Sequence, residues 1–173
     1  MISKKLIDVQ KEFYEIGRKD EEFVMESTAK IFGGTCEKSS RNEDMYDHID
    51  FWWYSPKKGR IGVDVKGVRR NTRKGELDDR IQWVELRNVR GDKGSLYGKA
   101  EYIAFRTFKD VIFVKRQKLL DFVLDKIKGK NTVYKCPWDF YIPYQRYGRL
   151  DLVVKMPTSD LYGLSDFLID CTS

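Results

Sequence analysis

Two aspartates and a lysine lie on neighbouring strand-like segments of the chain. Asp64 and Lys66 are two positions apart in residues 61–67, which alternate apolar and polar side chains, and Asp50 lies in a similar segment, residues 48–54. Because side chains alternate across a strand, Asp64 and Lys66 should share one face, opposite the apolar side chains. Carboxylates can hold a divalent cation, and a neighbouring lysine can stabilise developing negative charge.

The loop between the two segments predicts their register. Residues 55–59, Ser-Pro-Lys-Lys-Gly, are typical of an antiparallel hairpin in which Tyr54 lies across from Arg60. That register places Asp50 opposite Asp64, with Cβ atoms about 4.5–5.5 Å apart. Two like charges opposed in this way destabilise a sheet, and a bound Mg²⁺ would reverse the sign. A shift of one residue would put the aspartates on opposite faces, where both would be ordinary surface residues.

The composition is typical of a globular protein that stays in solution. The 173 residues suit a single domain, residues 1–173, and 41% of them are hydrophobic and 35% charged. No apolar run reaches the roughly 18–20 residues of a membrane-spanning helix. The first residues also lack the apolar stretch of a signal peptide. These features predict a cytoplasmic protein with no membrane partner.

The charge distribution favours a polyanionic partner. The formal net charge is +6 and the pI about 9.1, which indicates affinity for nucleic acid above all. A basic loop directly follows the strand that carries Lys66, and its side chains are expected to contact backbone phosphates; the alternative is a solvated charged turn. The expected phosphate contacts are Arg69, Arg70, Arg73 and Lys74. A second candidate for a substrate rim combines Tyr141, Tyr144 and Tyr147 with Arg146 and Arg149.

The cysteines and the histidine exclude other kinds of site. Cys36, Cys136 and Cys171 are scattered without zinc-ligand spacing, which favours reduced thiols. His48 is the only histidine, so neither a multi-histidine metal centre nor a Ser-His or Cys-His mechanism is expected.

The remaining pattern predicts one long helix followed mainly by strands. Apolar residues at three- and four-residue steps predict a helix over residues 4–32, which ends at Gly33-Gly34. Further strands are expected at 81–87, 102–108, 111–115, 132–135 and 150–155, and helices at 117–128 and from 157 onwards. This order predicts an α/β fold, a single domain with a central mixed β-sheet flanked by helices.

Asp50, followed fourteen positions later by Asp64-Val65-Lys66, resembles the D…(D/E)xK signature of the PD-(D/E)XK nuclease superfamily. Restriction endonucleases and Holliday-junction resolvases belong to it. The leading helix and the hairpin match the restriction-endonuclease-like core of that family over about residues 10–110. Ile49 stands at the position of the name-giving proline, which is often another residue in the family.

The resemblance implies roles for individual residues. Asp50, Asp64 and the carbonyl of Val65 would hold Mg²⁺, for which Mn²⁺ can substitute, and Lys66 would orient the attacking water or stabilise negative charge. In many members the first helix adds a glutamate, for which Glu21 fits better than Glu22. Some members carry a glutamine after this strand, and Gln82 is the match in this chain.

The function that the resemblance implies is Mg²⁺-dependent hydrolysis of phosphodiester bonds by an endonuclease. DNA is a better-matched substrate than RNA, and a homodimer is consistent with many relatives. Two alternatives use the same fold without catalysis: a nucleic-acid-binding module, and a phage or mobile-element protein that acts on a host component. Metal-dependent cleavage would separate the enzyme from the binding module, and nucleic-acid binding at low salt would separate both from the interaction factor.

Overall fold

The computed structural model describes the backbone of residues 4–70 and 76–172, and the side chains of residues 15–69 and 76–172. Arg73 and Lys74 of the basic loop lie outside the described residues, as does the side chain of Arg70. Within the described part of the chain, no helix combines the length and the hydropathy needed to traverse a bilayer.

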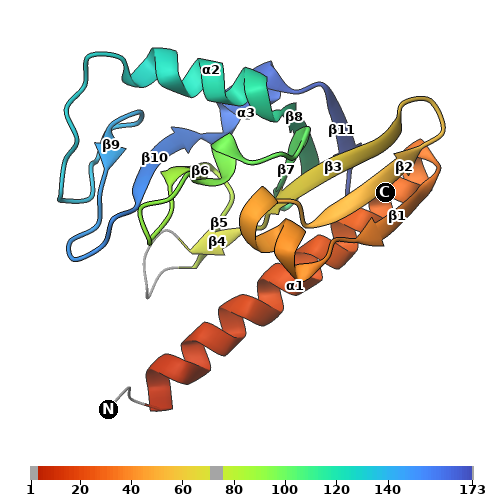
Figure 1. Cartoon of the computed structure of the whole chain (residues 1–173), viewed down its shortest axis with the longest axis horizontal. Helices are drawn as coiled ribbons and strands as arrows, with labels where there is room; N and C mark the ends of the chain where they lie inside the picture. The colour runs from red at the N-terminus through yellow and green to blue at the C-terminus, as the bar shows by residue number, and fades with distance from the viewer. Residues whose placement is uncertain (1–3, 71–75, 173) are drawn as a thin grey trace.

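The first helix has the predicted limits. Helix α1 covers Lys4–Phe32, and its first turns extend beyond the rest of the molecule (Figure 1). Gly33 follows it with a φ of 74°, a left-handed conformation that glycine adopts without a steric penalty. The Gly33 N–H donates to the Ala29 carbonyl at 3.0 Å, and the Trp53 indole donates to the Gly33 carbonyl at 2.9 Å. The first bond closes the last turn of α1, and the second joins the end of the helix to the central sheet.

The central sheet contains six strands and is mixed. Its order is β1-β2-β3-β7-β8-β11, and the pairing of β3 with β7 is parallel while the other pairings are antiparallel. The strands are β1 (Thr35–Lys38), β2 (Phe51–Ser55), β3 (Gly59–Lys66), β7 (Tyr102–Arg106), β8 (Asp110–Lys115) and β11 (Phe167–Asp170). The prediction of an α/β fold with a central mixed sheet flanked by helices is confirmed.

Smaller elements complete the structure. A three-stranded sheet has the order β6-β10-β9, and β4 pairs with β5 in a two-stranded ribbon. These strands are β4 (Arg69–Arg70), β5 (Leu77–Asp78), β6 (Ile81–Arg87), β9 (Pro143–Tyr144) and β10 (Leu152–Pro157). The remaining helices are the π-helix η1 (Glu43–Asp47), the 3-10 helix η2 (Ser95–Tyr97), α2 (Arg116–Ile127) and α3 (Thr158–Leu164).

Two hydrophobic clusters lie on opposite faces of the central sheet. One cluster packs α1 against Val63 and Val65 of β3 and their neighbours. The other cluster contains Ile103 and Phe105 of β7 together with side chains of α2, α3, β6 and β10. Figure 1 shows the corresponding layers, with α1 and α2 on opposite sides of the sheet. Alternation along β3 and β7 therefore directs neighbouring side chains into different layers.

Two expectations about local structure were wrong, and several short strands were not predicted. The strand expected over 48–54 begins only at Phe51, because residues 43–47 form a π-helix and His48 has a left-handed φ of 54°. Residues 132–135 form no strand and make a single bridge between Val133 and Tyr144. The short strands β1, β4, β5, β9 and β11 were not predicted, because segments of two to four residues are too short to show a period.

Candidate functional site

The β2–β3 hairpin has the register that its five-residue loop predicts. Tyr54 pairs with Arg60, and Phe51 with Val63, so the next position places Asp50 beside Asp64. Asp50 itself precedes β2, and its backbone N–H donates to the Val63 carbonyl at 2.9 Å. The predicted register is therefore confirmed up to Phe51, and Asp50 stands at the point where the regular ladder ends.

The Asp50 carboxylate takes the place of a backbone acceptor at this point. The Val65 N–H donates to Asp50 Oδ2 at 2.6 Å, which continues the β3 edge beyond the start of β2. In an antiparallel ladder the N–H and C=O of one residue point to the same neighbouring strand. The Val65 carbonyl is therefore directed to the edge on which the Asp50 carboxylate lies.

Asp64 is buried and points away from α1. Its neighbour across the parallel pairing is Ile103, which belongs to the cluster on the α2 side of the sheet. Asp64 is 3% exposed, and Lys66 Nζ donates to its Oδ1 at 2.7 Å. Within the described part of the chain, Asp64 Oδ2 has no hydrogen-bond partner although it is buried. A buried carboxylate oxygen without a partner is costly and can accept a cation or a donor from a ligand.

Burial makes both aspartates reluctant to ionise, and the negative charge of Asp64 adds to this effect at Asp50. Burial, together with the charge of Asp64, raises the pKa of Asp50 to about 7, against the opposing effects of Lys66 and the Val65 N–H. Burial also raises the pKa of Asp64, although Lys66, the Asp50 carboxyl and Arg69 favour its charged form. Two negative charges on the pair are therefore disfavoured, and a bound divalent cation would favour the ionised forms.

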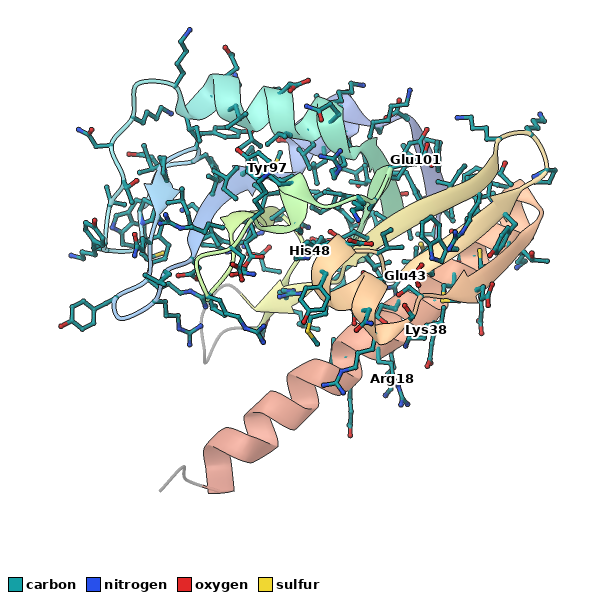
Figure 2. The ribbon with its side chains drawn as sticks, in the orientation of Figure 1. Arg18, Lys38, Glu43, His48, Tyr97 and Glu101 are labelled. Carbon is teal, nitrogen blue, oxygen red and sulfur yellow. The ribbon has the colours of Figure 1, made fainter. Side chains whose placement is uncertain are left out.

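Glu21 lies on α1 within electrostatic reach of Asp50. Burial and the negative charge of Asp50 raise the pKa of Glu21, while Lys38 opposes that shift from 3.4 Å. Asp44 on η1 also raises the pKa of Asp50. It is the third carboxylate whose charge is coupled to that of Asp50, after Asp64 and Glu21. Figure 2 shows Lys38 near the start of β2, beside α1. The sequence analysis missed Lys38 and Asp44, since neither β1 nor η1 shows a recognisable pattern.

Asp20 and Arg106 fix the position of α1 against the end of β3. Arg106 Nε donates to Asp20 Oδ1 at 2.8 Å, and the guanidinium lies 3.8 Å from the centre of the Phe23 ring. Burial raises the pKa of Asp20, while Arg106 and the Val68 N–H favour its charged form. A Cβ at Gly67 would collide with the Asp20 carboxylate, so glycine permits this close approach. The sequence analysis did not select Asp20, because its partner is 86 positions away in the chain.

The basic loop begins at Arg69, within electrostatic reach of Asp64 and Asp20. Arg69 is exposed, and its charge favours the ionised forms of Asp64 and Asp20 and so opposes the rise in their pKa. Arg69 and Arg70 form β4, which pairs with Leu77 and Asp78 of β5. The segment with the expected phosphate contacts therefore leaves the sheet directly after Lys66.

Gln82 lies on β6 with its side chain buried. It is 5% exposed, and its Nε2 has no hydrogen-bond partner among the described residues. It alternates in phase with Val84 and Leu86, which belong to the cluster on the same side of the sheet as Asp64. Gln82 thus offers an unused amide donor to the layer into which Asp64 points.

The donors at the end of β3 fit a hard divalent cation. They are the Asp50 carboxylate, the free oxygen of Asp64 and the carbonyl of Val65, all oxygen ligands of the kind that Mg²⁺ prefers. Among the described side chains, residues 15–69 and 76–172, no group of three His, Cys, Asp or Glu is arranged as a metal-ligand set. Mg²⁺ commonly binds through one or two carboxylates and keeps several waters, so two aspartates suffice for such a site.

Comparison of the chain with protein-family models, curated proteins and solved structures yields no match.

Proposed function

We propose that this protein is a metal-dependent nuclease that hydrolyses phosphodiester bonds in nucleic acid, with DNA as its substrate. The observation that carries the proposal is the half-buried Asp50 carboxylate beside the buried Asp64 carboxylate, both with raised pKa values, with Lys66 2.7 Å from Asp64. A restriction-endonuclease-like core with the PD-(D/E)XK signature is part of the same proposal. The mixed sheet, α1 and the confirmed hairpin register support it.

Asp50, Asp64 and the carbonyl of Val65 would hold Mg²⁺, or Mn²⁺ in its place. The bound ion would polarise the scissile phosphate and lower the pKa of a water ligand. Glu21 would act on the site through the repulsion between its negative charge and that of Asp50. The Val65 N–H keeps the Asp50 carboxylate in a fixed orientation, so little reorganisation is needed on binding.

Lys66 connects the carboxylates with the substrate side of the site. Its ammonium group is partly exposed, with 23% of the side-chain surface accessible, while the Asp64 side chain is 4% accessible. The ammonium can therefore reach a phosphate oxygen while it stays beside Asp64. A positive charge held there would stabilise negative charge that develops on the phosphate.

Incubation of the protein with labelled DNA and RNA substrates in Mg²⁺, Mn²⁺ or EDTA tests the proposal. The substrates should include a duplex, a single strand and a four-way junction. DNA cleavage is expected with Mg²⁺ or Mn²⁺ and none with EDTA. Asp64→Asn should abolish cleavage, because it removes a charged ligand with little change in volume, and circular dichroism should show an unchanged fold. Asp125→Asn on the exposed face of α2 is the matched control and should cleave normally.

A catalytically inactive nucleic-acid-binding module is the second candidate. It is favoured by the 2.7 Å contact between Lys66 and Asp64, which lets the lysine neutralise the buried carboxylate without any metal. This candidate predicts binding of DNA that is the same in EDTA and Mg²⁺, and no cleavage in either. A protein that acts on a host component would bind no nucleic acid at low salt.

A further inference from the structure

An arm between α2 and β10, residues 129–150, carries aromatic rings that the fold leaves uncovered. Trp138 is 94% exposed and Tyr147 95% exposed, and Tyr134 is 65% exposed. By contrast, Trp53 in the central sheet is 6% exposed. Single exposed rings also occur elsewhere, at Tyr46 and Phe108, but the arm brings three of them onto one segment, which points to a role in binding.

The backbone beneath Trp138 is held by contacts to β10. Lys155 Nζ donates to the carbonyls of Pro137 and Trp138 at 2.8 and 2.7 Å, and the Tyr141 N–H donates to the Lys155 carbonyl at 2.9 Å. The Tyr141 hydroxyl is hydrogen-bonded to Asp160. Tyr141 therefore anchors the arm, and its place in a substrate rim stays a prediction.

The other half of the arm is joined to β6 and to itself. The Val133 N–H donates to the Pro143 carbonyl at 2.9 Å, and the Gln145 N–H donates to the Val133 carbonyl at 3.0 Å. Arg87 Nε donates to the Leu150 carbonyl at 2.6 Å. These bonds hold the backbone of the arm in place while the rings of Trp138 and Tyr147 face solvent, so little ordering is required when a ligand binds.

The arm is also positively charged. It contains four basic residues and one acid, Asp139, and three of the basic side chains are exposed: Lys130, Lys135 and Arg149. The fourth, Arg146, is paired with the buried Asp151. Interfaces between proteins are depleted in lysine, whereas a basic surface that carries separate aromatic rings is typical of single-stranded nucleic-acid binding.

We propose that this arm binds single-stranded DNA, with unpaired bases stacked on Trp138 and Tyr147 and the phosphates held by the exposed basic side chains. Bases within a duplex are already stacked and present no free face, so the arm selects single-stranded segments. The inference rests on the proposed nuclease function, because it names the substrate class that the enzyme would take. It assigns binding to a part of the molecule other than the Asp64 site.

Fluorescence anisotropy with labelled oligo-dT and with a blunt DNA duplex tests the proposal. All titrations contain EDTA, so that cleavage does not contribute. Trp138→Ala and Tyr147→Ala should each weaken oligo-dT binding by about fivefold or more, the loss expected for one stacked base. Duplex binding should change by less than about twofold, and Trp138→Phe should retain most of the parent affinity because a flat ring remains.

Phe108→Ala is the matched control, since that ring is 57% exposed but lies in the turn between β7 and β8. It should leave oligo-dT binding unchanged, and thermal melting should show that every variant is folded. Parent-like oligo-dT binding by Trp138→Ala and Tyr147→Ala would overturn the proposal and favour a protein partner. Equal losses on duplex and single strand would also overturn it. Since binding is read in EDTA, failure of the arm is distinguished from failure of the nuclease, which is read as Mg²⁺-dependent cleavage.

Discussion

Asp50→Asn should stabilise the folded protein at pH 8 when divalent ions are absent. The asparagine has nearly the volume of aspartate, and its amide oxygen can still accept the Val65 N–H that bonds Asp50 Oδ2 at 2.6 Å. What the substitution removes is the negative charge that burial and Asp64 make costly. The variant should therefore lose no packing and be relieved of the electrostatic repulsion.

The size of the effect follows from the pKa of Asp50. The ordinary value of 3.8 is raised to about 7, so the difference between the folded and unfolded states is about 3 pKa units. Each unit corresponds to about 1.4 kcal/mol, which gives a destabilisation of roughly 4 kcal/mol once the carboxyl is ionised in both states. Because the folded state binds the proton more tightly, this cost is absent below the unfolded pKa. It grows as the pH rises from about 4 and is complete above about 7.

Urea denaturation in EDTA at pH 5 and pH 8, followed by tryptophan fluorescence, measures the difference. Between these pH values the parent should lose about 3 kcal/mol of unfolding free energy relative to Asp50→Asn. Comparison of the two proteins at each pH cancels the contributions of titrating groups remote from Asp50, and the remaining difference belongs to Asp50 and the carboxyls coupled to it, Asp64 and Glu21. If the variant is no more stable than the parent at pH 8, the ionised Asp50 carboxylate does not destabilise the fold, and the reasoning is refuted.

The same measurement with Mg²⁺ separates a cation site from a merely buried carboxyl. Mg²⁺ should stabilise the parent at pH 8, by about 2.7 kcal/mol at one hundred times its dissociation constant. Asp50→Asn should respond much less, because a charged ligand is missing. An equal response of both proteins to Mg²⁺ would exclude Asp50 as a ligand.

Two further variants separate chemistry from binding across a salt series. Lys66→Ala should abolish turnover while the slope of log affinity against log salt on duplex DNA changes by no more than one phosphate contact, about 0.9 units. Replacing Arg69, Arg70 and Arg73 together with alanine should flatten that slope by up to roughly 2–3 units, similarly for unrelated sequences. An unchanged slope in the triple variant would mean that the loop is a solvated turn.

Local patterns in the sequence predicted the parts of the fold that depend on neighbouring residues. Helix α1 was predicted with its observed limits, since 29 residues hold many turns of one apolar period and end at a pair of glycines. The hairpin register was predicted from a five-residue loop and a two-residue alternation, and the structure has that register rather than one shifted by one residue. The start of β2 was wrong because a π-helix, stabilised by its own backbone bonds, overrides the alternation at His48.

Contacts between residues far apart in the sequence determine the burial of Asp64 and the position of α1, which the sequence alone did not predict. The parallel pairing of β3 with β7 sets Asp64 beside Ile103, which packs in the cluster on the α2 side, and Asp64 is 3% exposed, whereas alternation alone would leave it on a solvent face. The contact of Asp20 with Arg106 spans 86 positions and sets where α1 meets the end of β3. Residue spacing along a strand or helix determined which side chains share a face. The burial of that face, which shifts the pKa of Asp50 and Asp64, arises only when remote segments pack over it.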